Sequence, residues 1–581
     1  MSLASSLSPR HLLSDVARLV PIFSWLPHYD RSNLRADIVA GIAIWALVIP
    51  QHVAYAQIAG LRPEAGIFVS IWAPLVYAIF GTSRQLMCGP SSSTAIISAA
   101  HVATIARGDM RLFVTLSAAL AVLAGVIFIV LGAFRLGFVS AFISSAVQIG
   151  FLFGLGLTIA MGQTFTLLDI PSVDGAFVDQ ARHLVRHVDE ISWWSLGVGV
   201  VAFAVVLGID RYWPRVPSAL VVVVLGILAV TFFGLKDHRV ATIGDIKGRL
   251  PDFEVPMISL SMWAQLLPGA VAIVLVCYSE STTIARRYAD AHHYEVRPDQ
   301  ELVALGASSL VCGLFQGFCS SGGASQSAAN DRNGARTQMT SLVLALLAAL
   351  TAVVLMPLLA NLPFAVLAAI VINAVLGFFD FASARRVFRI RRASFLAGFL
   401  SFVAFLVGGI LVGLVVGMGV SLLLLLVDLA RPSVSEMAPV AHSDVLVPAD
   451  SSAAQPLPGL LVVRPNAPLL YINAPTIRDE IGARLSTTTP PPRVLLLDLE
   501  ESSSVDDTVL DMLESLQRGL SDLGAALWLC NVHESLLATL NADAVLVQHG
   551  MQVHQTVADA IGAFAPGDSG SPGLPGNESA R

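Results

Sequence analysis

One feature divides this chain into two parts: apolar blocks of about 20 residues repeat from Ala36 to Leu429 and then stop. A helix of that length crosses the ~30 Å hydrocarbon core of a bilayer. Hydrophobic residues make up 55% of the sequence and charged residues only 13%, against roughly a quarter charged in an average soluble domain. The expected solvent of the first part is therefore lipid, and the predicted fold class is a polytopic α-helical membrane protein.

We expect fourteen spans, of which the third and the tenth are short. They cover residues 36–59, 64–81, 91–106, 112–133, 138–162, 192–209, 215–235, 263–286, 300–318, 325–335, 338–357, 363–378, 394–410 and 411–430.

The arginines predict the orientation of these spans, because short cytoplasmic loops are rich in Lys and Arg. With the N-terminus inside, the cytoplasmic loops receive Arg84, Arg135, Arg211, Arg215, Arg286, Arg287, Arg332, Arg336 and the run Arg385, Arg386, Arg389, Arg391 and Arg392. The two long loops, about 167–191 and 236–262, then lie outside. We therefore expect a multi-pass protein of the cell (inner) membrane with both ends of the chain in the cytoplasm.

The spans form two groups of seven with opposite orientation, because seven is odd, and this predicts an inverted repeat of the kind found in secondary transporters. The third and tenth spans occupy corresponding places, and each follows a break rich in small polar residues, at 88–93 and 320–325. Non-helical backbone at membrane depth is tolerated where it is buried or lines a cavity. We expect these two helix N-termini to face one another and to hold an anion at the midplane, with Ser91, Ser92 and Ser325 as donors. The alternative is a pair of flexible interfacial loops.

Glu280 is the single carboxylate in the apolar span 263–286. An ionisable group at that depth is costly, which favours a functional role. Thr283 follows about one helical turn later, and a carboxylate beside hydroxyls can hold a co-transported cation. That cation is H⁺ or Na⁺, and in the second case Glu280 would be a Na⁺ ligand. The alternative is a structural partner for a helix N-terminus.

Gln51 and Tyr55 lie four residues apart in the first span, directly after Pro50. A locally unwound helix would present both side chains to one cavity, and His52 would add a titratable group beside them. The alternative is that Pro50 only kinks the helix and His52 is a packing residue.

The second part of the chain begins with a Pro/Ser/Ala-rich linker at 433–458, followed by a small α/β domain at 459–565. Its strands are predicted at Leu460–Val463, Leu469–Ile472, Val494–Leu499 and Ala525–Leu529, and its helices at 475–485, 507–522 and 533–541. The tail at 566–581 has the composition of a disordered segment. The first 35 residues lack the pattern of a removable signal peptide, so we expect a cytoplasmic N-terminal segment at 1–35 ahead of a membrane domain at 36–432.

Other classes of function find little support in the sequence. A net charge of -7 offers no long basic face for nucleic acid. The five cysteines show no paired spacing and are interpreted as packing residues, not as a disulfide framework or a metal site. No Ser/His pair or cluster of metal ligands falls within the spans, so we expect neither an enzyme nor a bound cofactor.

The run PQHVAYAQIAGLRPEAGIF at residues 50–68 resembles the signature of the sulfate permease (SulP) family, bacterial relatives of the solute carrier 26 anion transporters. Further segments similar to that family follow in order at 81–95, 279–289, 299–318, 327–338 and 362–372. The resemblance implies seven plus seven helices, with a gate domain formed by roughly spans five to seven and twelve to fourteen and with a mobile core domain. It also implies an elevator-like movement, a homodimer and a C-terminal STAS domain.

The resemblance further implies that the anion lies between the third and tenth spans and that the acid of the eighth span is Glu280. Together with the reasoning above, it gives one set of predicted substrate contacts: Gln51, Tyr55, Gly89, Ser91, Ser92, Ala324, Ser325 and Gln326. Glu280 and Thr283 are the predicted contacts of the coupling ion.

Two positions depart from the family pattern. Many relatives carry an arginine where this chain has Gln326, so either a co-transported H⁺ or Na⁺ replaces that charge, which we favour, or the substrate carries less charge than sulfate. In the STAS-like segment, Asp507 stands where related domains carry a phosphorylatable serine, with Thr508 beside it. A fixed charge that helps to cap a helix is the simpler interpretation, and the domain is expected to serve assembly or to bind a partner protein.

The function expected from the sequence is secondary active transport of an inorganic anion, with sulfate as the leading candidate. Bicarbonate and C4-dicarboxylates are the alternative substrates. A membrane sensor that moves no substrate is the alternative class.

Overall fold

A computed structural model of the chain describes residues 20–138, 144–171, 177–213, 216–235, 240–244, 248–440, 446–542 and 551–564. The chain divides into two compact units, Met1–Ser421 and Leu422–Arg581. The predicted tail 566–581 lies outside the described residues, as do residues 1–19 of the predicted N-terminal segment.

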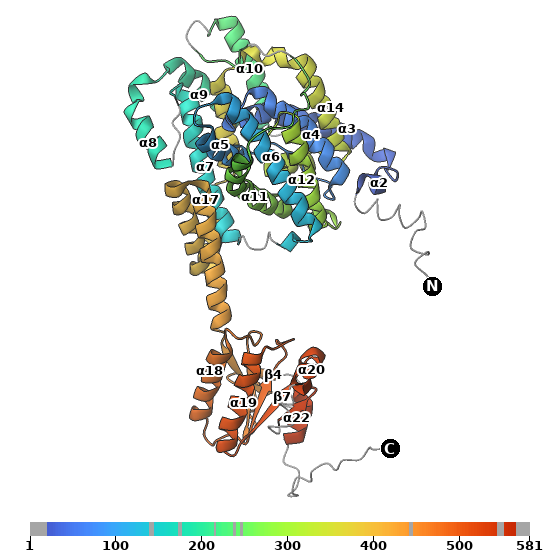
Figure 1. Cartoon of the computed structure of the whole chain (residues 1–581), viewed down its shortest axis with the longest axis vertical. Helices are drawn as coiled ribbons and strands as arrows, with labels where there is room; N and C mark the ends of the chain where they lie inside the picture. Colours follow the sequence, from blue (N-terminus) through green and yellow to red (C-terminus); the bar gives the residue numbers. More distant parts are fainter. Residues whose placement is uncertain are drawn as a thin grey trace. The chain divides into compact units, whose positions relative to one another are not determined.

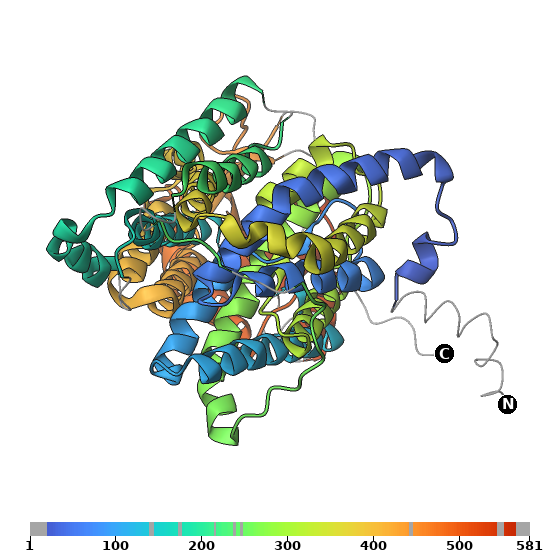
Figure 2. The same cartoon turned by 90° about the horizontal axis from the view of Figure 1, so that it is seen from above.

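The first unit is helical (Figures 1 and 2). Its main helices are α3 (Leu34–Ile58), α4 (Pro63–Phe80), α5 (Ser92–Ala106), α6 (Met110–Ala133), α7 (Ser145–Leu168), α9 (Trp193–Tyr212), α10 (Ser218–Phe233), α11 (Leu260–His292), α12 (Pro298–Leu314), α13 (Ala324–Arg332), α14 (Met339–Leu350), α15 (Phe364–Leu376) and α17 (Arg392–Ala430). Shorter helices are α2 (Ile22–Trp25), α8 (Phe177–Arg186) and α16 (Phe381–Ile390). Backbone dihedrals at Gly409 interrupt α17, which therefore comprises two apolar helices.

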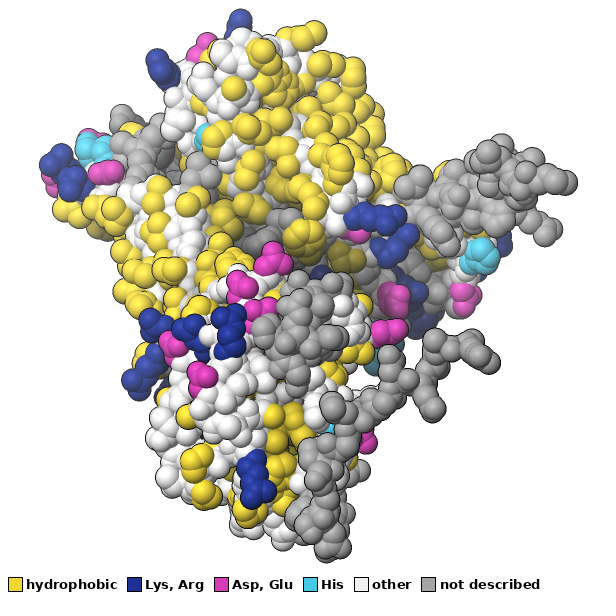
Figure 3. Space-filling view, turned by 60° about the horizontal axis from the view of Figure 1, so that its bottom comes forward, with side chains coloured by type: hydrophobic (Ala, Val, Ile, Leu, Met, Phe, Trp, Pro, Cys, Tyr) yellow, Lys and Arg dark blue, Asp and Glu magenta, His cyan; other side chains and the backbone are white. Residues whose placement is uncertain are grey.

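Ten helices in the described part of the chain are long and apolar enough to cross a membrane. Large hydrophobic side chains such as Val201, Leu225 and Phe232 are exposed on this unit, and broad hydrophobic areas are visible in the space-filling view of Figure 3. Such surface suits lipid as the solvent. The prediction of a polytopic helical membrane protein is confirmed.

The first and last turns of these helices follow ordinary capping chemistry. Asp109, Ser144 and Ser259 precede α6, α7 and α11, and each side chain accepts a hydrogen bond from a backbone N–H of the first turn. Pro63 and Pro298 occupy the first position of α4 and α12, where a missing N–H costs nothing. These local signals explain why helix starts could be located in the sequence.

Two short strands at the centre of this unit link its halves. Strand β1 (Cys88–Gly89) pairs antiparallel with β2 (Ser321–Gly322), with Cys88 opposite Gly322 and Gly89 opposite Ser321. Helix α5 begins directly after β1 and helix α13 directly after β2. The two polar breaks recognised in the sequence are therefore paired with one another and buried.

The second unit contains a six-stranded sheet of order β4-β3-β5-β6-β7-β8. The strands are β3 (Val434–Pro439), β4 (Leu446–Pro448), β5 (Leu460–Pro465), β6 (Val494–Asp498), β7 (Ala526–Cys530) and β8 (Gln552–His554), and β5 to β8 run parallel. Side chains alternate between the two faces of the sheet. Leu495 and Leu497 belong to the core with α18 (Ala474–Thr487), α19 (Asp507–Asp522) and α20 (Glu534–Ala542), whereas Leu496 and Trp528 pack with α22 (Val557–Phe564). The prediction of a C-terminal α/β domain is confirmed.

Two local predictions are wrong. The predicted linker at 433–458 contributes β3 and β4 to the sheet, where β3 pairs with β5. The predicted strand Leu469–Ile472 does not form, because Ser502, Asn473 and Asp506 side chains accept hydrogen bonds from three of its backbone N–H groups. At Pro50, where two interpretations were open, helix α3 continues without local unwinding, since one missing N–H can be tolerated inside a packed membrane helix.

The start of α19 differs in a smaller way from the prediction. Asp506 is the N-cap residue and accepts a hydrogen bond from the Val509 backbone N–H. Asp507 occupies the first helical position, so its charge lies at the helix start but its side chain is not the cap.

Candidate functional site

The candidate site lies where α5 and α13 begin. The pairing of β1 with β2 holds these two helix starts against each other, and the Gly323 N–H donates to the Met87 carbonyl at 3.0 Å. The first N–H groups of a helix have no partner inside that helix and carry partial positive charge. Two such ends brought together can stabilise an anion without a basic side chain.

The start of α5 is organised by a chain of hydroxyls. Ser91 caps the helix and accepts from the Thr94 N–H. The Ser91 and Ser93 hydroxyl oxygens lie 2.9 Å apart, and Ser93 donates to Glu280 Oε2 at 3.0 Å. Glu280 lies on α11, so this hydrogen bond connects the candidate anion site to the membrane-embedded carboxylate.

Glu280 also borders a small cavity of about 20 Å³. The cavity is lined by Gln148, Phe151 and Leu152 of α7, Val276, Ser279 and Glu280 of α11, and Leu414 of α17. Within the described residues, Glu280 forms no ion pair. The carboxylate therefore has one hydroxyl partner and lies next to space for about one water molecule.

Thr283 is not the hydroxyl that meets Glu280. It is exposed, and its hydroxyl donates to the Ser279 carbonyl at 2.7 Å within α11. Ser93 makes the contact instead. The sequence contained this serine in the Ser91–Ser93 run, but helix periodicity within α11 pointed to Thr283 because it ignores contacts between helices.

Gln326 lies in the first turn of α13, and its side chain is buried. Gln326 is 2% exposed, and its amide nitrogen lies 2.9 Å from His52 Nε2 and 3.2 Å from the Pro90 carbonyl. His52 Nδ1 is 2.5 Å from Ser70 Oγ, which donates to the Gly66 carbonyl at 2.7 Å. His52 and Ser70 are thus functional candidates that the sequence reasoning left aside or missed.

The remaining predicted residues divide by exposure. Gln51, Tyr55, Ser91 and Ser92 are buried. The Gln51 side-chain oxygen is buried without a hydrogen-bond partner among the described residues, which marks it as a group that an additional ligand or water would satisfy.

Among the other predicted contacts, Ala324 and Ser325 are exposed, whereas Gly89 is buried. A Cβ atom on Gly89 would lie 2.9 Å from His52 Cε1, so this close approach requires glycine. Ser281, which the prediction omitted, accepts a hydrogen bond from the Gly322 N–H at 2.9 Å and supports β2.

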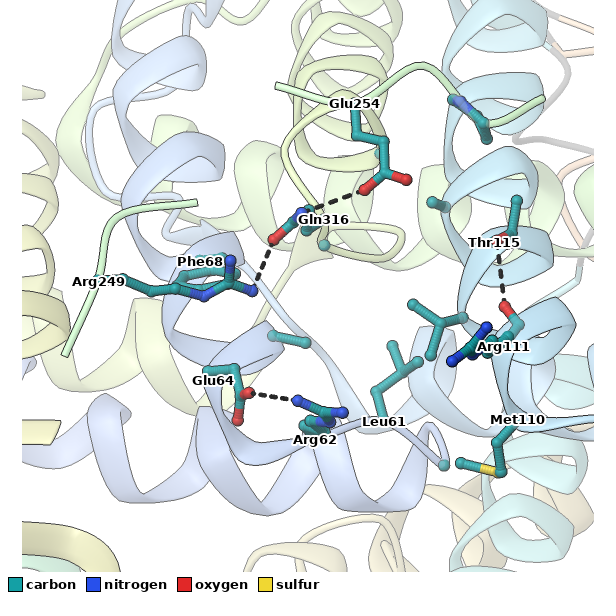
Figure 4. Close-up of a pocket in the computed structure, with 17 residues that line it drawn as sticks. Leu61, Arg62, Glu64, Phe68, Met110, Arg111, Thr115, Arg249, Glu254 and Gln316 are labelled. Atoms are coloured by element: carbon teal, nitrogen blue, oxygen red, sulfur yellow. Dashed lines mark hydrogen bonds and ion pairs between the residues drawn. The ribbon is translucent and has the colours of Figure 1, made fainter. Parts of the chain in front are cut away.

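A larger pocket, of about 630 Å³, lies elsewhere in the same unit (Figure 4). Arg62, Arg111 and Arg249 line it together with Glu64 and Glu254. None of the predicted site residues borders it. The described residues contain no cluster of three or more His, Cys, Asp or Glu side chains that could hold a metal ion.

Comparison with known proteins agrees with the architecture. Residues 34–401 match the sulfate permease family, and residues 452–560 match the STAS domain. A probable sulfate transporter of Mycobacterium tuberculosis is 32% identical over 547 residues, covering 92% of this chain and 96% of the relative. Sulfate transporter 3.1 of Arabidopsis thaliana is 28% identical over 585 residues, covering 94% and 86%.

Two solved structures share the fold. The murine solute carrier 26 family member A9 anion transporter, in its inward-facing state, superposes with a TM-score of 0.86 at 24% identity and covers 97% of this chain and 96% of that one. The transmembrane domain of the cyanobacterial bicarbonate transporter BicA superposes with a TM-score of 0.60 at 21% identity, covering 67% of this chain and 98% of that one. Most of the chain thus matches one family and one fold, and the chain belongs to the sulfate permease family, as an anion transporter with a C-terminal STAS domain and not an enzyme.

Proposed function

We propose that this protein is a secondary active transporter of an inorganic anion, with sulfate as the leading substrate, coupled to H⁺ or Na⁺. The observation that carries the proposal is the pair of helix starts at α5 and α13, joined through β1 and β2 and connected to Glu280 by Ser93. The sulfate assignment takes its support from the relatives named as sulfate transporters. Apart from the linker, the domain boundaries of the first section are part of the same proposal. So are the contacts of the anion with Gln51, Tyr55, Gly89, Ser91, Ser92, Ala324, Ser325 and Gln326.

The proposed movement is an elevator-like displacement in a fourteen-span, seven-plus-seven inverted repeat. Supporting it, β1 precedes the third helix of the first half and β2 precedes the corresponding helix of the second half. Glu280 lies at the boundary between the helices of the anion site and α7 and α17, which the resemblance assigns to the gate domain. A cation bound at Glu280 would remove the negative charge beside an entering anion, which couples the two binding events. The assembly proposed is a homodimer, with both termini in the cytoplasm and the STAS domain open to a protein partner.

The test is uptake of radiolabelled sulfate by the purified protein in liposomes, with and without imposed pH and Na⁺ gradients. Unlabelled sulfate, bicarbonate and C4-dicarboxylates compete in parallel. We expect one of the two gradients to drive accumulation, and the competition identifies the preferred anion among the three. Uptake that is the same with and without both gradients would contradict cation coupling. An absence of uptake for the whole panel would contradict the proposal of transport.

Gln326→Arg belongs in the same assay. A full positive charge at the start of α13 is expected to strengthen binding of a dianion relative to a monoanion, or to weaken the dependence on the cation. Unchanged competition and unchanged gradient dependence would mean that this position lies outside the anion site.

Bicarbonate is the second candidate substrate. The likeness in fold to the bicarbonate transporter BicA and the glutamine at position 326 favour it. The competition panel separates the two candidates directly.

A further inference from the structure

The buried pair of His52 and Gln326 lies beside both helix starts, and the transport mechanism above assigns no role to His52. Both side chains are at most 2% exposed. They come from α3 and α13, and their nitrogens, Nε2 of each, are 2.9 Å apart. The hydrogen-bond partners around them determine which atom of the Gln326 amide faces the site.

The protonation pattern of His52 follows from Ser70. The Ser70 hydroxyl donates to the Gly66 carbonyl at 2.7 Å, so its oxygen can only accept from His52 Nδ1, 2.5 Å away. The neutral ring therefore carries its proton on Nδ1 and presents a lone pair on Nε2. Only an N–H donor can face that lone pair, and the Gln326 amide nitrogen supplies it.

The Pro90 carbonyl accepts a second, longer hydrogen bond from the same amide nitrogen. It lies 3.2 Å from the Gln326 amide nitrogen and can only accept. Turning the amide over would set its oxygen against both the Pro90 carbonyl and the His52 lone pair. Both N–H groups of Gln326 are thereby used, and only its oxygen is left.

That oxygen lies close to both polar breaks. A Cβ atom built on Gly89 would be 3.6 Å from Gln326 Oε1, and one built on Gly323 would be 2.8 Å from it. Among the described residues, Gln326 Oε1 has no hydrogen-bond donor. The side chain that replaces the family's arginine therefore offers an acceptor at the place where an arginine would offer donors.

We propose that His52 is a specificity-determining positioning residue: by holding the Gln326 amide nitrogen, it leaves the amide oxygen to meet the substrate, which favours oxyanions that carry an O–H group. Hydrogen carbonate and singly protonated dicarboxylates carry such a group, whereas sulfate at neutral pH does not. An acceptor facing a fully deprotonated oxyanion repels it, and an acceptor facing an O–H forms a hydrogen bond. The inference rests on the proposed function of anion transport, because it concerns the same anion site, and within that function it favours the second candidate, bicarbonate, over sulfate.

The experiment measures the ratio of the KM values for sulfate and hydrogen carbonate, in proteoliposomes containing the full chain. His52→Phe keeps a planar ring but removes the acceptor, so the Gln326 amide can turn its nitrogen towards the anion. Ser70→Ala removes the acceptor for Nδ1, so the ring can carry its proton on Nε2. That N–H then donates to the Gln326 oxygen, which favours the turned amide over the longer hydrogen bond to Pro90. In both variants we expect the KM for sulfate divided by the KM for hydrogen carbonate to fall by about tenfold or more. A change of that size corresponds to one hydrogen bond to a charged group.

Ser117→Ala is the matched control. Ser117 is also a buried helical serine whose hydroxyl donates to the carbonyl four residues earlier, at 2.9 Å to Phe113, but it lies on α6 and contacts neither His52 nor Gln326. Its ratio should equal that of the unmodified protein.

The outcomes separate the inference from the proposed function. If the unmodified protein transports oxyanions and the ratio stays within about twofold in His52→Phe or Ser70→Ala, His52 does not set specificity. Should His52→Phe fail to fold, Ser70→Ala decides alone. If the unmodified protein transports none of these anions, the proposed function fails and the inference falls with it.

Discussion

At the scale of single residues, the contact between Ser93 and Glu280 connects the start of α5 to α11. A hydroxyl can donate to a carboxylate, and it can accept from a protonated carboxyl group. Ser93 therefore suits either protonation state of Glu280, as a group that binds and releases a cation requires.

Replacing Glu280 by glutamine tests this role. Glutamine keeps the size and can still accept from Ser93, but it cannot bind a proton or neutralise Na⁺. We expect accumulation against a gradient to fall by about tenfold or more, because uptake is no longer coupled to a cation, while exchange of bound anion continues. The measurement is steady-state accumulation and counterflow in proteoliposomes. Glu254→Gln, at an acid outside the spans that accepts from Gln316, is the control, and normal accumulation by Glu280→Gln would remove the residue from the mechanism.

His554 provides a pH-dependent prediction in the second unit. Burial lowers the pKa of His554 below its ordinary value, with a smaller opposing effect of Asp559, and its ring lies 4.7 Å from that of Trp528. The folded domain thus favours the neutral ring. Its stabilising effect is complete above the ordinary histidine pKa and is lost as pH falls through and below it.

Hydrogen exchange of the full chain, followed in peptides around β7 and β8, should therefore speed up between pH 7 and pH 5. In His554→Phe, which keeps a ring against Trp528 but cannot titrate, that additional exchange should disappear. His533, exposed and bonded to the Glu500 carbonyl, is the control position for the same substitution. Equal acid sensitivity of His554→Phe and the unmodified chain would contradict this prediction.

At the scale of elements, close approach between membrane helices depends on small residues. A Cβ atom on Gly150 of α7 would lie 1.9 Å from the Gly398 carbonyl oxygen of α17. Such a contact involves backbone, so a larger residue forces the helices apart.

Gly150→Ala is therefore expected to destabilise the protein, on the order of 3 kcal/mol, and to lower the apparent Tm in detergent. Gly162→Ala is a matched control in the same helix, because a Cβ atom there meets no atom within 4 Å. It should leave Tm unchanged or raise it slightly, since alanine favours helix. Equal Tm values for the two variants would show that the helices are not in close contact at Gly150.

For the whole chain, the proposed topology states which side of the membrane each loop faces, and this can be tested with introduced cysteines. The five native cysteines are buried, and burial raises the pKa of the Cys530 thiol, which leaves little reactive thiolate. The unmodified chain should therefore react poorly with a membrane-impermeant maleimide. This makes it a suitable background for single introduced cysteines.

Arg182→Cys on α8 and Arg389→Cys on α16 replace exposed arginines in loops proposed to face opposite sides. In intact cells, we expect the reagent to label Arg182→Cys but not Arg389→Cys, and the reverse in inverted membranes. Arg478→Cys in the second unit should be labelled from the same side as Arg389→Cys. Labelling of Arg182→Cys and Arg389→Cys from one side would contradict the proposed topology.

Helix positions were largely readable from the sequence, because length, apolar composition and caps such as Asp109 act locally. Elements that depend on partners distant in the sequence could not be read from it. The segment 433–458 looked like a linker, yet β3 becomes a strand through its pairing with β5. Leu469–Ile472 looked like a strand, yet side chains of Asn473, Ser502 and Asp506 take its backbone N–H groups.

Hydrophobicity and the positions of Gly, Pro and Ser are local properties, so the sequence alone was enough to show that lipid is the solvent for most of the chain and that two polar breaks interrupt it. The folded molecule was needed to show that those breaks pair with each other, that Ser93 and not Thr283 contacts Glu280, and that His52 reaches Gln326. These contacts join segments up to hundreds of residues apart. Their geometry is set by how helices pack, which no periodicity within one helix encodes.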